Sequence, residues 1–466
     1  MPPDVGPDLK RPDQKRVVVV GAGITGLATA RFLTQAGLAV TVVEAGDRPG
    51  GKIQTRALAG VPVEAGPDTF LARVPWAVDL CRELGLGDDL VAPATGKAWL
   101  WIGDRLRPLP ERHVLGVPTA LGPLWRSGVL SPAGVARAAL DLVLPRSDHG
   151  DDPSVASVVG RRMGRQVVER LVDPLVGGIN AGRAEALSLA ATARPISEGA
   201  RRSRSLVVGL RRAPAGPPGP VFLGITGGLN RLVDRLAADI DDLRPGTAVT
   251  RLSAADGGGY RLDCGAGEGI DTGAVVLTVP SFAAAEMVSL LSPVAAGHLG
   301  AIRHASVVTA TLAYRPSAVG RPLEGAGMLV PRVEGRLLTA CTWSTSKWPD
   351  LAASGMVLLR ASAGRDGDER AIALDDAEIV RRVHDELREA LGLREEPVDS
   401  LVSRWPRGFP QYEVGHRERV DAIEAALAAD APGVLVAGAA YRGLGVAACI
   451  EQARRVAALV TAAVSA

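Results

Sequence analysis

Three glycines, Gly21, Gly23 and Gly26, are the clearest chemical signal in this sequence of 466 residues. They follow a run of four valines, residues 17–20, and precede a stretch with the apolar spacing of a helix, residues 24–37. Between a strand and a helix, the GxGxxG spacing allows a tight turn, close approach of the backbone to a pyrophosphate, and packing of the helix on the strand. The free N–H groups at the start of the helix then point at the phosphates. The motif therefore predicts a dinucleotide site, with a glycine turn that binds no ligand as the alternative.

Glu44 ends the second strand of the same strand–helix–strand unit. Its carboxylate can accept hydrogen bonds from both ribose hydroxyls of a dinucleotide, and it would repel a 2′-phosphate. NADP is therefore disfavoured, and NAD and FAD remain.

Residues 21–52, which read GAGITGL…VVEAGDRPGGK, resemble the FAD superfamily of amine-oxidase and glutathione-reductase type. In that superfamily the segment equivalent to 50–52 passes over the pyrophosphate toward the flavin. Residues 433–449, GVLVAGAAYRGLGVAAC, have the form of the strand and helix that close the cofactor site. A helix that begins near Gly445 can direct its dipole at the electron-rich end of a reduced flavin. The resemblance implies non-covalent FAD, because Cys449 lies inside this helix and outside the Cys-Gly-Gly-Tyr context of a covalent flavin link.

Two further segments resemble a narrower group, the oxygen-dependent protoporphyrinogen/coproporphyrinogen oxidase family. They are residues 64–73, EAGPDTFLAR, and residues 173–189, DPLVGGINAGRAEALSL. Residues 221–236 and 440–450 agree with this family but also suit other members of the superfamily. The resemblance is closest to the Gram-positive coproporphyrinogen III oxidases. It implies an enzyme of haem biosynthesis that uses FAD and oxygen to convert coproporphyrinogen III to coproporphyrin III, with release of hydrogen peroxide.

The resemblance also implies a set of FAD contacts. No residue is expected to be catalytic in its own right, because the flavin takes the hydride and the protein positions the reactants. No metal ligands are expected either. The FAD contacts are, at the phosphates, Gly21, Ala22, Gly23, Ile24, Thr25, Gly26 and Lys52; at the adenosine end, Glu44, Ala45 and Val249; and, at the flavin end, Gly66, Pro67, Asp68, Thr69, Trp405, Leu444, Gly445 and Val446.

Two residues are expected to contact the substrate. Arg73 can bind a carboxylate through two hydrogen bonds, and Asn180 would lie close to the reacting ring. Each of these assignments has an alternative: Arg73 as a solvated arginine and Asn180 as a turn residue. Among the cofactor contacts, Trp405 could be a core residue and Lys52 an exposed turn lysine.

Several functions remain open at this point. Protoporphyrinogen IX carries two carboxylates where coproporphyrinogen III carries four, and the sequence does not show which arginines face the substrate. The latter substrate is favoured because the composition, with 48 Arg and 5 Lys, is typical of actinobacteria and the resemblance is to Gram-positive members. An amine oxidase or a carotenoid desaturase would suit the same scaffold, although Ala439 and Ala440 replace the acid that many superfamily members carry. A catalytically inactive flavin-binding scaffold is the remaining alternative.

The elements that must position these residues indicate an α/β fold, α+β overall and amine-oxidase-like. We expect a Rossmann-like FAD-binding domain, a mixed-sheet substrate domain and a helical lobe. The expected limits are a disordered tail at 1–15; a discontinuous FAD-binding domain at 16–75, 221–285 and 400–466; a helical lobe at 95–215; and a substrate-binding sheet domain at 286–399.

Composition narrows the partners and the compartment. A net charge of +2 gives no reason to expect nucleic acid. The four cysteines are far apart, so neither a zinc site nor a disulfide framework is expected, and a cytoplasmic location fits best. No signal peptide and no spanning segment are expected. The expected partners are the porphyrinogen, molecular oxygen and a ferrochelatase of the same pathway.

Overall fold

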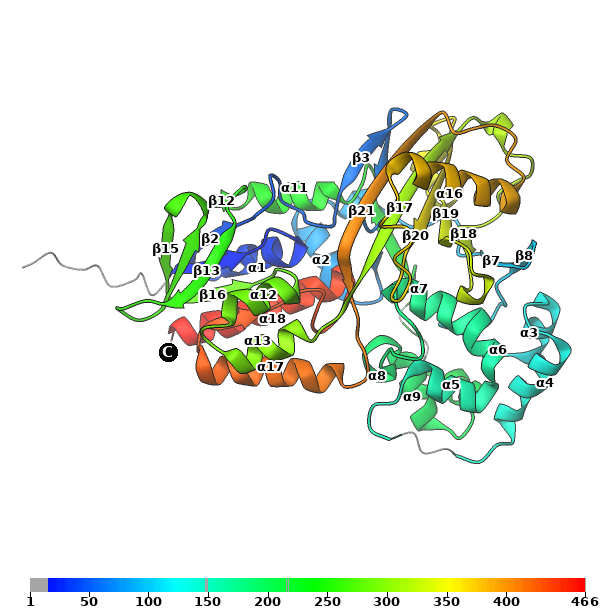
Figure 1. The fold of residues 1–466 in the computed structure, drawn as a ribbon, viewed down its shortest axis with the longest axis horizontal. Coiled ribbons are helices and arrows are strands. Elements are labelled where there is room, and N and C mark those ends of the chain that lie inside the picture. The colour runs from blue at the N-terminus through cyan, green and yellow to red at the C-terminus, as the bar shows by residue number, and fades with distance from the viewer. Residues whose placement is uncertain (1–15, 147–149, 215, 217, 466) are drawn as a thin grey trace, which may run out of the picture.

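The computed structural model describes residues 16–146, 150–214, 216 and 218–465. The tail expected at residues 1–15 lies outside these described residues. Figure 1 shows a parallel sheet flanked by helices on the left, a sheet of long strands at the upper right and a group of helices at the lower right. The expected fold class, a mixed α/β protein with a Rossmann-like part, is confirmed by this arrangement.

The parallel sheet has five strands in the order β12-β2-β1-β16-β22, each parallel to its neighbours. Residues 17–20 are buried, as expected for a strand covered on both faces. Helices α1, α2, α11 and α18 share one hydrophobic core with this sheet. A three-stranded antiparallel sheet and helices α12, α13 and α17 share the core on its other face. The bounds are β1 Arg16–Val20, α1 Ile24–Gln35, β2 Ala39–Val43, α2 Pro75–Glu83, α11 Asn230–Ala238, β12 Asp242–Arg244, β13 Val249–Ala254, β14 Tyr260–Cys264, β15 Gly269–Thr272, β16 Ala274–Leu277, α12 Ser281–Val288, α13 Pro293–Gly300, α17 His416–Asp430, β22 Val434–Val436 and α18 Val446–Ser465.

The long-stranded sheet is mixed and has seven strands in the order β21-β17-β20-β19-β18-β7-β8. Only the β18–β7 pair is parallel among the described strands of this sheet. Helix α16 covers one face, where its apolar side chains share a core with β17, β19 and β20. Leu58 and Val63 pack against part of the opposite face, at Ala313 and Leu358, and the free part of that face forms the wall of a cavity. The bounds are β7 Ala98–Ile102, β8 Arg105–Pro108, β17 His304–Tyr314, β18 Gly327–Leu329, β19 Leu338–Trp343, β20 Val357–Ala363, α16 Asp376–Leu391 and β21 Asp399–Pro410.

The helical part has its own hydrophobic core. It contains a π-helix, η3 (Val168–Gly177), with Pro174 inside it. A buried ion pair also holds this part together: Nε of Arg162 lies 2.9 Å from Oδ1 of Asp141, with the two side chains 3% and 0% exposed. The helices are α3 Leu121–Ser127, α4 Pro132–Ala139, η2 Leu140–Leu142, α5 Val155–Met163, α6 Arg165–Val167, α7 Gly178–Asn180, α8 Leu189–Thr192, α9 Arg194–Arg202 and α10 Leu206–Arg211.

Short elements connect these three parts. Strand β11 pairs with both β5 and β6. None of the helices in the described ranges is long and apolar enough to cross a membrane. The connecting elements are β3 Thr55–Leu58, β4 Val61–Glu64, β5 Phe70–Leu71, η1 Gly87–Asp89, β6 Leu90–Val91, β9 His113–Val114, β10 Val117–Pro118, β11 Phe222–Ile225, η4 Gly265–Gly267, η5 Pro316–Ala318, η6 Arg332–Glu334, α14 Ser344–Lys347 and α15 Pro349–Ala352.

The strand pairing does not follow the domain limits expected from the sequence. Strands β7 and β8 lie within the expected helical lobe at 95–215, yet they belong to the seven-stranded sheet. Most of β21 lies within the expected FAD-binding segment at 400–466, yet it pairs with β17. Helix α13, expected in the sheet domain at 286–399, packs with the nucleotide-side core. The physical reason is that contacts between segments far apart in sequence, whether strand pairing or helix packing, leave no local signal in the sequence.

Candidate active site

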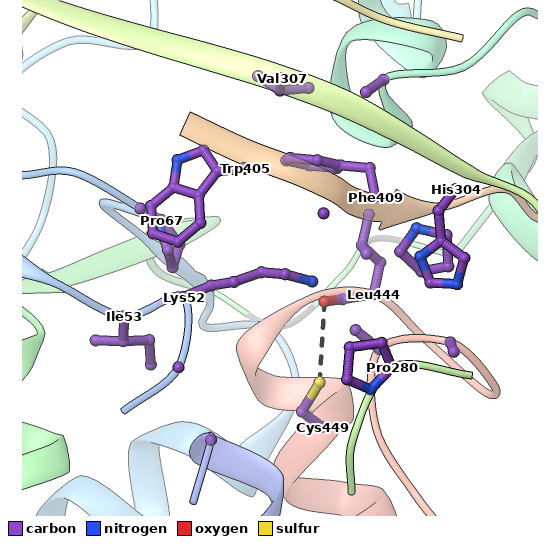
Figure 2. Close-up of a pocket in the computed structure, with 18 of the residues that line it drawn as sticks. Lys52, Ile53, Pro67, Pro280, His304, Val307, Trp405, Phe409, Leu444 and Cys449 are labelled. Atoms are coloured by element: carbon purple, nitrogen blue, oxygen red, sulfur yellow. Dashed lines mark hydrogen bonds between the residues drawn. The ribbon is translucent and has the colours of Figure 1, made fainter. Parts of the chain in front are cut away.

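A cavity of about 970 Å³ lies between the parallel sheet and the free face of the seven-stranded sheet. Its volume is at the upper end of the range of about 300–1,000 Å³ that is typical of ligand pockets. The glycine turn and Glu44 line one part of it, and residues of β17, β20 and the π-helix line another. Figure 2 shows the region between these parts.

The glycine turn has the geometry that a bound pyrophosphate requires. Gly21 has a φ of +101°, which L side chains rarely adopt. A Cβ on Gly26 would lie 1.8 Å from the carbonyl oxygen of Gly21, so helix α1 packs directly on the turn. A Cβ on Gly23 would meet no protein atom within 4 Å, although Gly23 lines the cavity. The open space at Gly23 is therefore where a phosphate can approach the backbone.

Glu44 closes the same end of the cavity, directly after β2. Its Oε2 accepts a hydrogen bond from the Ala22 N–H at 2.7 Å, and its Oε1 accepts one from the Gly46 N–H at 2.8 Å. Each carboxylate oxygen has a further lone pair for a ribose hydroxyl. Ala45 and Val249 line the cavity beside it, as expected for the adenosine end.

Replacing Glu44 with Ala should lower the affinity for FAD roughly tenfold to a hundredfold, because hydrogen bonds to a charged group contribute about 1.5–3 kcal/mol. Fluorescence titration of the apoprotein with FAD measures the change. Asp47→Ala is a matched control, since it removes an exposed carboxylate from the same loop that does not line the cavity. An unchanged titration for Glu44→Ala would exclude Glu44 as the ribose ligand.

Lys52 projects into the cavity. Figure 2 shows its ammonium group directed toward Leu444, in the region of Phe409 and His304. It makes no hydrogen bond or ion pair with the residues that the structure describes, and the surrounding protein lowers the pKa of its ammonium group. The ammonium thus lies among the residues expected at the flavin end, whereas the sequence interpretation placed it at the pyrophosphate.

The residues expected at the flavin end are brought together from three segments. Residues 66–69, Trp405 and residues 444–446 all line the cavity. A Cβ on Gly66 would lie 1.7 Å from the carbonyl oxygen of Lys52, so these two loops are in direct contact. Helix α18 begins at Val446, which places its N-terminus at the cavity. The dipole of this helix therefore favours negative charge there.

Asp68 contributes its backbone to this wall while its carboxylate is engaged elsewhere. Its Oδ2 accepts hydrogen bonds from Nζ of Lys347 at 2.6 Å and from Nε1 of Trp348 at 3.3 Å. Burial alone would raise the pKa of Asp68, but the Lys347 and Arg360 cations hold it below its usual range. Asp68 is therefore a fixed anion in an ion pair.

Four expected contacts do not line the cavity. Ala22 donates its N–H to the Glu44 carboxylate, and Gly26 packs against the Gly21 carbonyl oxygen of the turn. Arg73 is exposed. Asn180 is 6% exposed, and its side-chain amide donates to the Val176 carbonyl oxygen at 2.7 Å. Asn180 thus occupies the position of a turn residue, just before Ala181 with its φ of +47°.

Other cavity residues were not expected from the sequence. The π-helix and the turn after it contribute a stretch that includes Asp173, Pro174 and Ile179, and the sheet contributes alternate residues of β17 and β20. Because β17 is buried along almost its whole length, its sequence does not show which of its residues face the cavity. Arg365 follows β20 and lines the same wall. No local motif marks it among the many arginines.

His304 is a further cavity residue that the sequence did not single out. Its Nδ1 lies 3.1 Å from the Arg407 carbonyl oxygen and its Nε2 lies 2.9 Å from Oγ of Ser281. The carbonyl can only accept, so Nδ1 carries the proton and Nε2 accepts from the hydroxyl. Burial and the nearby Lys52 lower the pKa of His304 to about 4, which keeps the imidazole neutral at physiological pH.

The family model described as flavin-containing amine oxidoreductase matches residues 24–461. The chain is 37% identical to a coproporphyrinogen III oxidase of Bacillus subtilis (strain 168), over 95% of this chain and 97% of that protein. It is 34% identical to a coproporphyrinogen III oxidase of Propionibacterium freudenreichii, over 96% and 92%. The crystal structure of a protein from Exiguobacterium sp. 255-15, provisionally named a protoporphyrinogen oxidase, superposes with a TM-score of 0.87 at 32% identity, over 96% of this chain and 99% of that one.

Proposed function

Since this chain belongs to the flavin-containing amine oxidoreductase family, in which its relatives include coproporphyrinogen III oxidases, we propose that it oxidises coproporphyrinogen III to coproporphyrin III in haem biosynthesis. Oxygen is the electron acceptor, and each two-electron oxidation releases one hydrogen peroxide. The observation that carries this proposal is the identity of 37% to the Bacillus subtilis enzyme over nearly the whole of both chains.

FAD is the cofactor that fits the cavity. The open backbone at Gly23, the carboxylate of Glu44 and the N-terminus of α18 suit its pyrophosphate, ribose and flavin in turn. When bound, FAD supplies the hydride acceptor and passes the electrons to oxygen. The protein holds the cofactor at one wall and leaves the opposite wall for the substrate.

The FAD is bound without a covalent link. Cys449 is one cavity residue that could form such a link, but burial raises the pKa of its thiol, and the thiolate is the reactive form. Its Sγ lies 3.9 Å from the carbonyl oxygens of Gly443 and Leu444, inside the first turn of α18 and its approach. Cys449 therefore acts as a small buried side chain.

The second wall suits a bulky, largely apolar macrocycle with carboxylate groups. Val307, Ile179 and Phe409 give it apolar surface, and Arg360 and Arg365 give it cations. Arg360 donates hydrogen bonds to the backbone carbonyl oxygens of Ala65 and Gly66, so its position is tied to the expected flavin side. His304, which is neutral at physiological pH, adds no further charge to the cavity.

Two secondary proposals follow from the reaction. The product is a porphyrin that awaits a metal, so a ferrochelatase is the enzyme that consumes it. The four described cysteines are all free and buried, which is compatible with a reducing compartment, and we place the enzyme in the cytoplasm.

Protoporphyrinogen IX is the alternative substrate, and the name of the Exiguobacterium relative favours it.

Anaerobic mixing of the purified protein with each porphyrinogen tests the function. Coproporphyrinogen III should bleach the flavin absorbance faster than protoporphyrinogen IX does. Its KM should also rise more steeply with salt, because a ligand with more carboxylates depends more on interactions that are screened over about 10 Å at 0.1 M. Acid precipitation should release all of the flavin as FAD.

The possible outcomes separate the alternatives. Faster bleaching by protoporphyrinogen IX at every salt concentration would replace the substrate and leave the oxidase function standing. A flavin that neither porphyrinogen bleaches would overturn the oxidase function itself. Flavin retained by the acid precipitate would contradict non-covalent binding only.

A further inference from the structure

Arg365 lies on the cavity wall opposite the glycine turn, directly after β20. It follows Gly364, whose φ of +90° turns the chain out of the sheet. A Cβ on Gly364 would lie 2.7 Å from the carbonyl oxygen of Ser306, so the backbone of this turn packs closely on β17. Arg365 is 7% exposed and lines the cavity. Its position is thus fixed by the sheet.

Three neighbouring arginines form a rigid frame around this turn. Arg332 donates hydrogen bonds to the carbonyl oxygens of Asp366 and Gly182, both at 3.1 Å. Arg183 forms an ion pair with the Asp366 carboxylate at 2.8 Å, and Arg303 forms a second ion pair with the same carboxylate. Each of these three arginines therefore has partners within the protein, and together they hold the loop that carries Arg365.

Arg365 differs from all three. Its side chain makes no hydrogen bond or ion pair with the residues that the structure describes, and its Nε is buried without a partner. The opposite charges near it are Asp173 and Asp368, and the like charges are Arg332 and Arg370. Burial lowers the pKa of Arg365 to about 10, so the guanidinium is still charged at neutral pH.

Neither nearby carboxylate neutralises Arg365. Asp173 accepts a hydrogen bond from the Ala184 N–H at 2.9 Å, and its other oxygen lies 3.8 Å from Nε of Arg332. Burial also raises the pKa of Asp173, which weakens its negative charge. Asp368 is held by Arg370 through two hydrogen bonds of 2.8 Å. A buried cation without a counter-charge is unfavourable, so this guanidinium is suited to an anionic partner that enters the cavity.

We propose that Arg365 binds a carboxylate of the substrate and thereby fixes the orientation of the macrocycle on the wall opposite the cofactor. A guanidinium can donate two parallel hydrogen bonds to a carboxylate, which sets both distance and plane. The phosphates of the cofactor have their own site at the start of α1, so they do not compete for Arg365. The paired arginines around it hold the loop backbone that carries Arg365 before the substrate arrives.

This inference rests on the proposed function, and its test uses the FAD-loaded enzyme. Arg365→Met should raise KM for coproporphyrinogen III roughly tenfold to a hundredfold and weaken binding of the product coproporphyrin III by a similar factor. The value of kcat should change much less, because a remote carboxylate contact stabilises the bound ground state and the transition state about equally. The KM of Arg365→Lys should lie between those of the wild type and Arg365→Met. A lysine keeps the positive charge but cannot donate two parallel hydrogen bonds to one carboxylate.

Two controls separate binding from structure. Arg105→Met removes an exposed arginine of β8 outside the cavity. Its KM and kcat should stay within about twofold of the wild-type values. The thermal midpoint of the Arg365→Met apoprotein should be unchanged or raised, because an unpaired buried charge is removed. A lowered midpoint with unchanged KM would mean that Arg365 is structural and would overturn the inference.

The remaining outcomes are also decisive. Loss of FAD from Arg365→Met, with substrate affinity retained in the loaded fraction, would assign the residue to the cofactor and overturn the inference. A wild-type enzyme that no porphyrinogen reduces would instead overturn the proposed function. An active wild type beside an Arg365→Met variant with unchanged KM and product affinity would leave the function standing and remove only this contact.

Discussion

Gly26→Ala should destabilise the protein by on the order of 3 kcal/mol or more and abolish FAD binding. The new Cβ would lie 1.8 Å from the Gly21 carbonyl oxygen and 2.7 Å from Oγ1 of Thr278. Both neighbours are fixed, because that hydroxyl donates to the carbonyl oxygens of Val20 and Gly21. Helix α1 would have to move off the sheet. Urea unfolding of the apoprotein, followed by circular dichroism, measures the loss of stability.

Gly23→Ala is the matched control: it should lower the affinity for FAD with little effect on stability. Gly23 has a φ of −69°, which alanine adopts freely, and its Cβ would meet no protein atom within 4 Å. The apoprotein should therefore unfold at nearly the wild-type urea concentration. The methyl group would still occupy the space left for the pyrophosphate, so FAD affinity should fall. Tight FAD binding by Gly23→Ala would contradict the placement of the phosphates at this turn.

Arg162→Met should lower the free energy of unfolding by about 3–5 kcal/mol, because it leaves the carboxylate of Asp141 buried without a counter-charge. Asp141 is 0% exposed. It also accepts hydrogen bonds from the Ser205 hydroxyl at 2.6 Å and from the N–H groups of Leu206 and Val207 at 3.1 and 3.0 Å. The ion pair thus connects α5, η2 and the start of α10. Denaturant unfolding measures the effect.

The double variant Asp141→Asn/Arg162→Met should recover part of this stability, since it removes both charges and keeps an acceptor for α10. Arg381→Met, which breaks an exposed pair on α16, should change stability little. The ion pair of Asp141 does not line the cavity, so KM and kcat of folded Arg162→Met should equal those of the wild type. Equal stability of Arg162→Met and the wild type would show that the pair contributes nothing to the folded state.

The cofactor half of the site could be predicted because its information is local. The turn at Gly21, the start of α1 and Glu44 belong to one continuous strand–helix–strand unit, and their spacing alone specifies their geometry. The closing helix was identified from the resemblance of residues 433–449 to the FAD superfamily. The structure brings these segments to one cavity, as the mixed α/β class requires.

The substrate half could not be predicted because its information is distributed. Whether an arginine faces the cavity depends on strand pairing between distant segments, such as β17 with β20 and β21. Arg73 and Arg365 are alike as letters in a sequence, yet one is exposed and the other is 7% exposed on the cavity wall. The same nonlocal pairing moved the expected domain limits at 95–215 and 400–466.

The π-helix η3 has a consequence for how this wall can change over evolutionary time. A π-helix accommodates one more residue per hydrogen-bonded turn than an α-helix, so the fold tolerates an extra residue in this segment. Since one residue corresponds to about 100° of rotation at 3.6 residues per turn, deleting a single residue here would turn Ile179 and its neighbours to another bearing around the helix axis. The residues that face the macrocycle could thus be exchanged together by one codon gained or lost, without a substitution at any of them. A change of length at residues 168–177 would therefore alter several residues of the wall in one step, whereas a point mutation alters one.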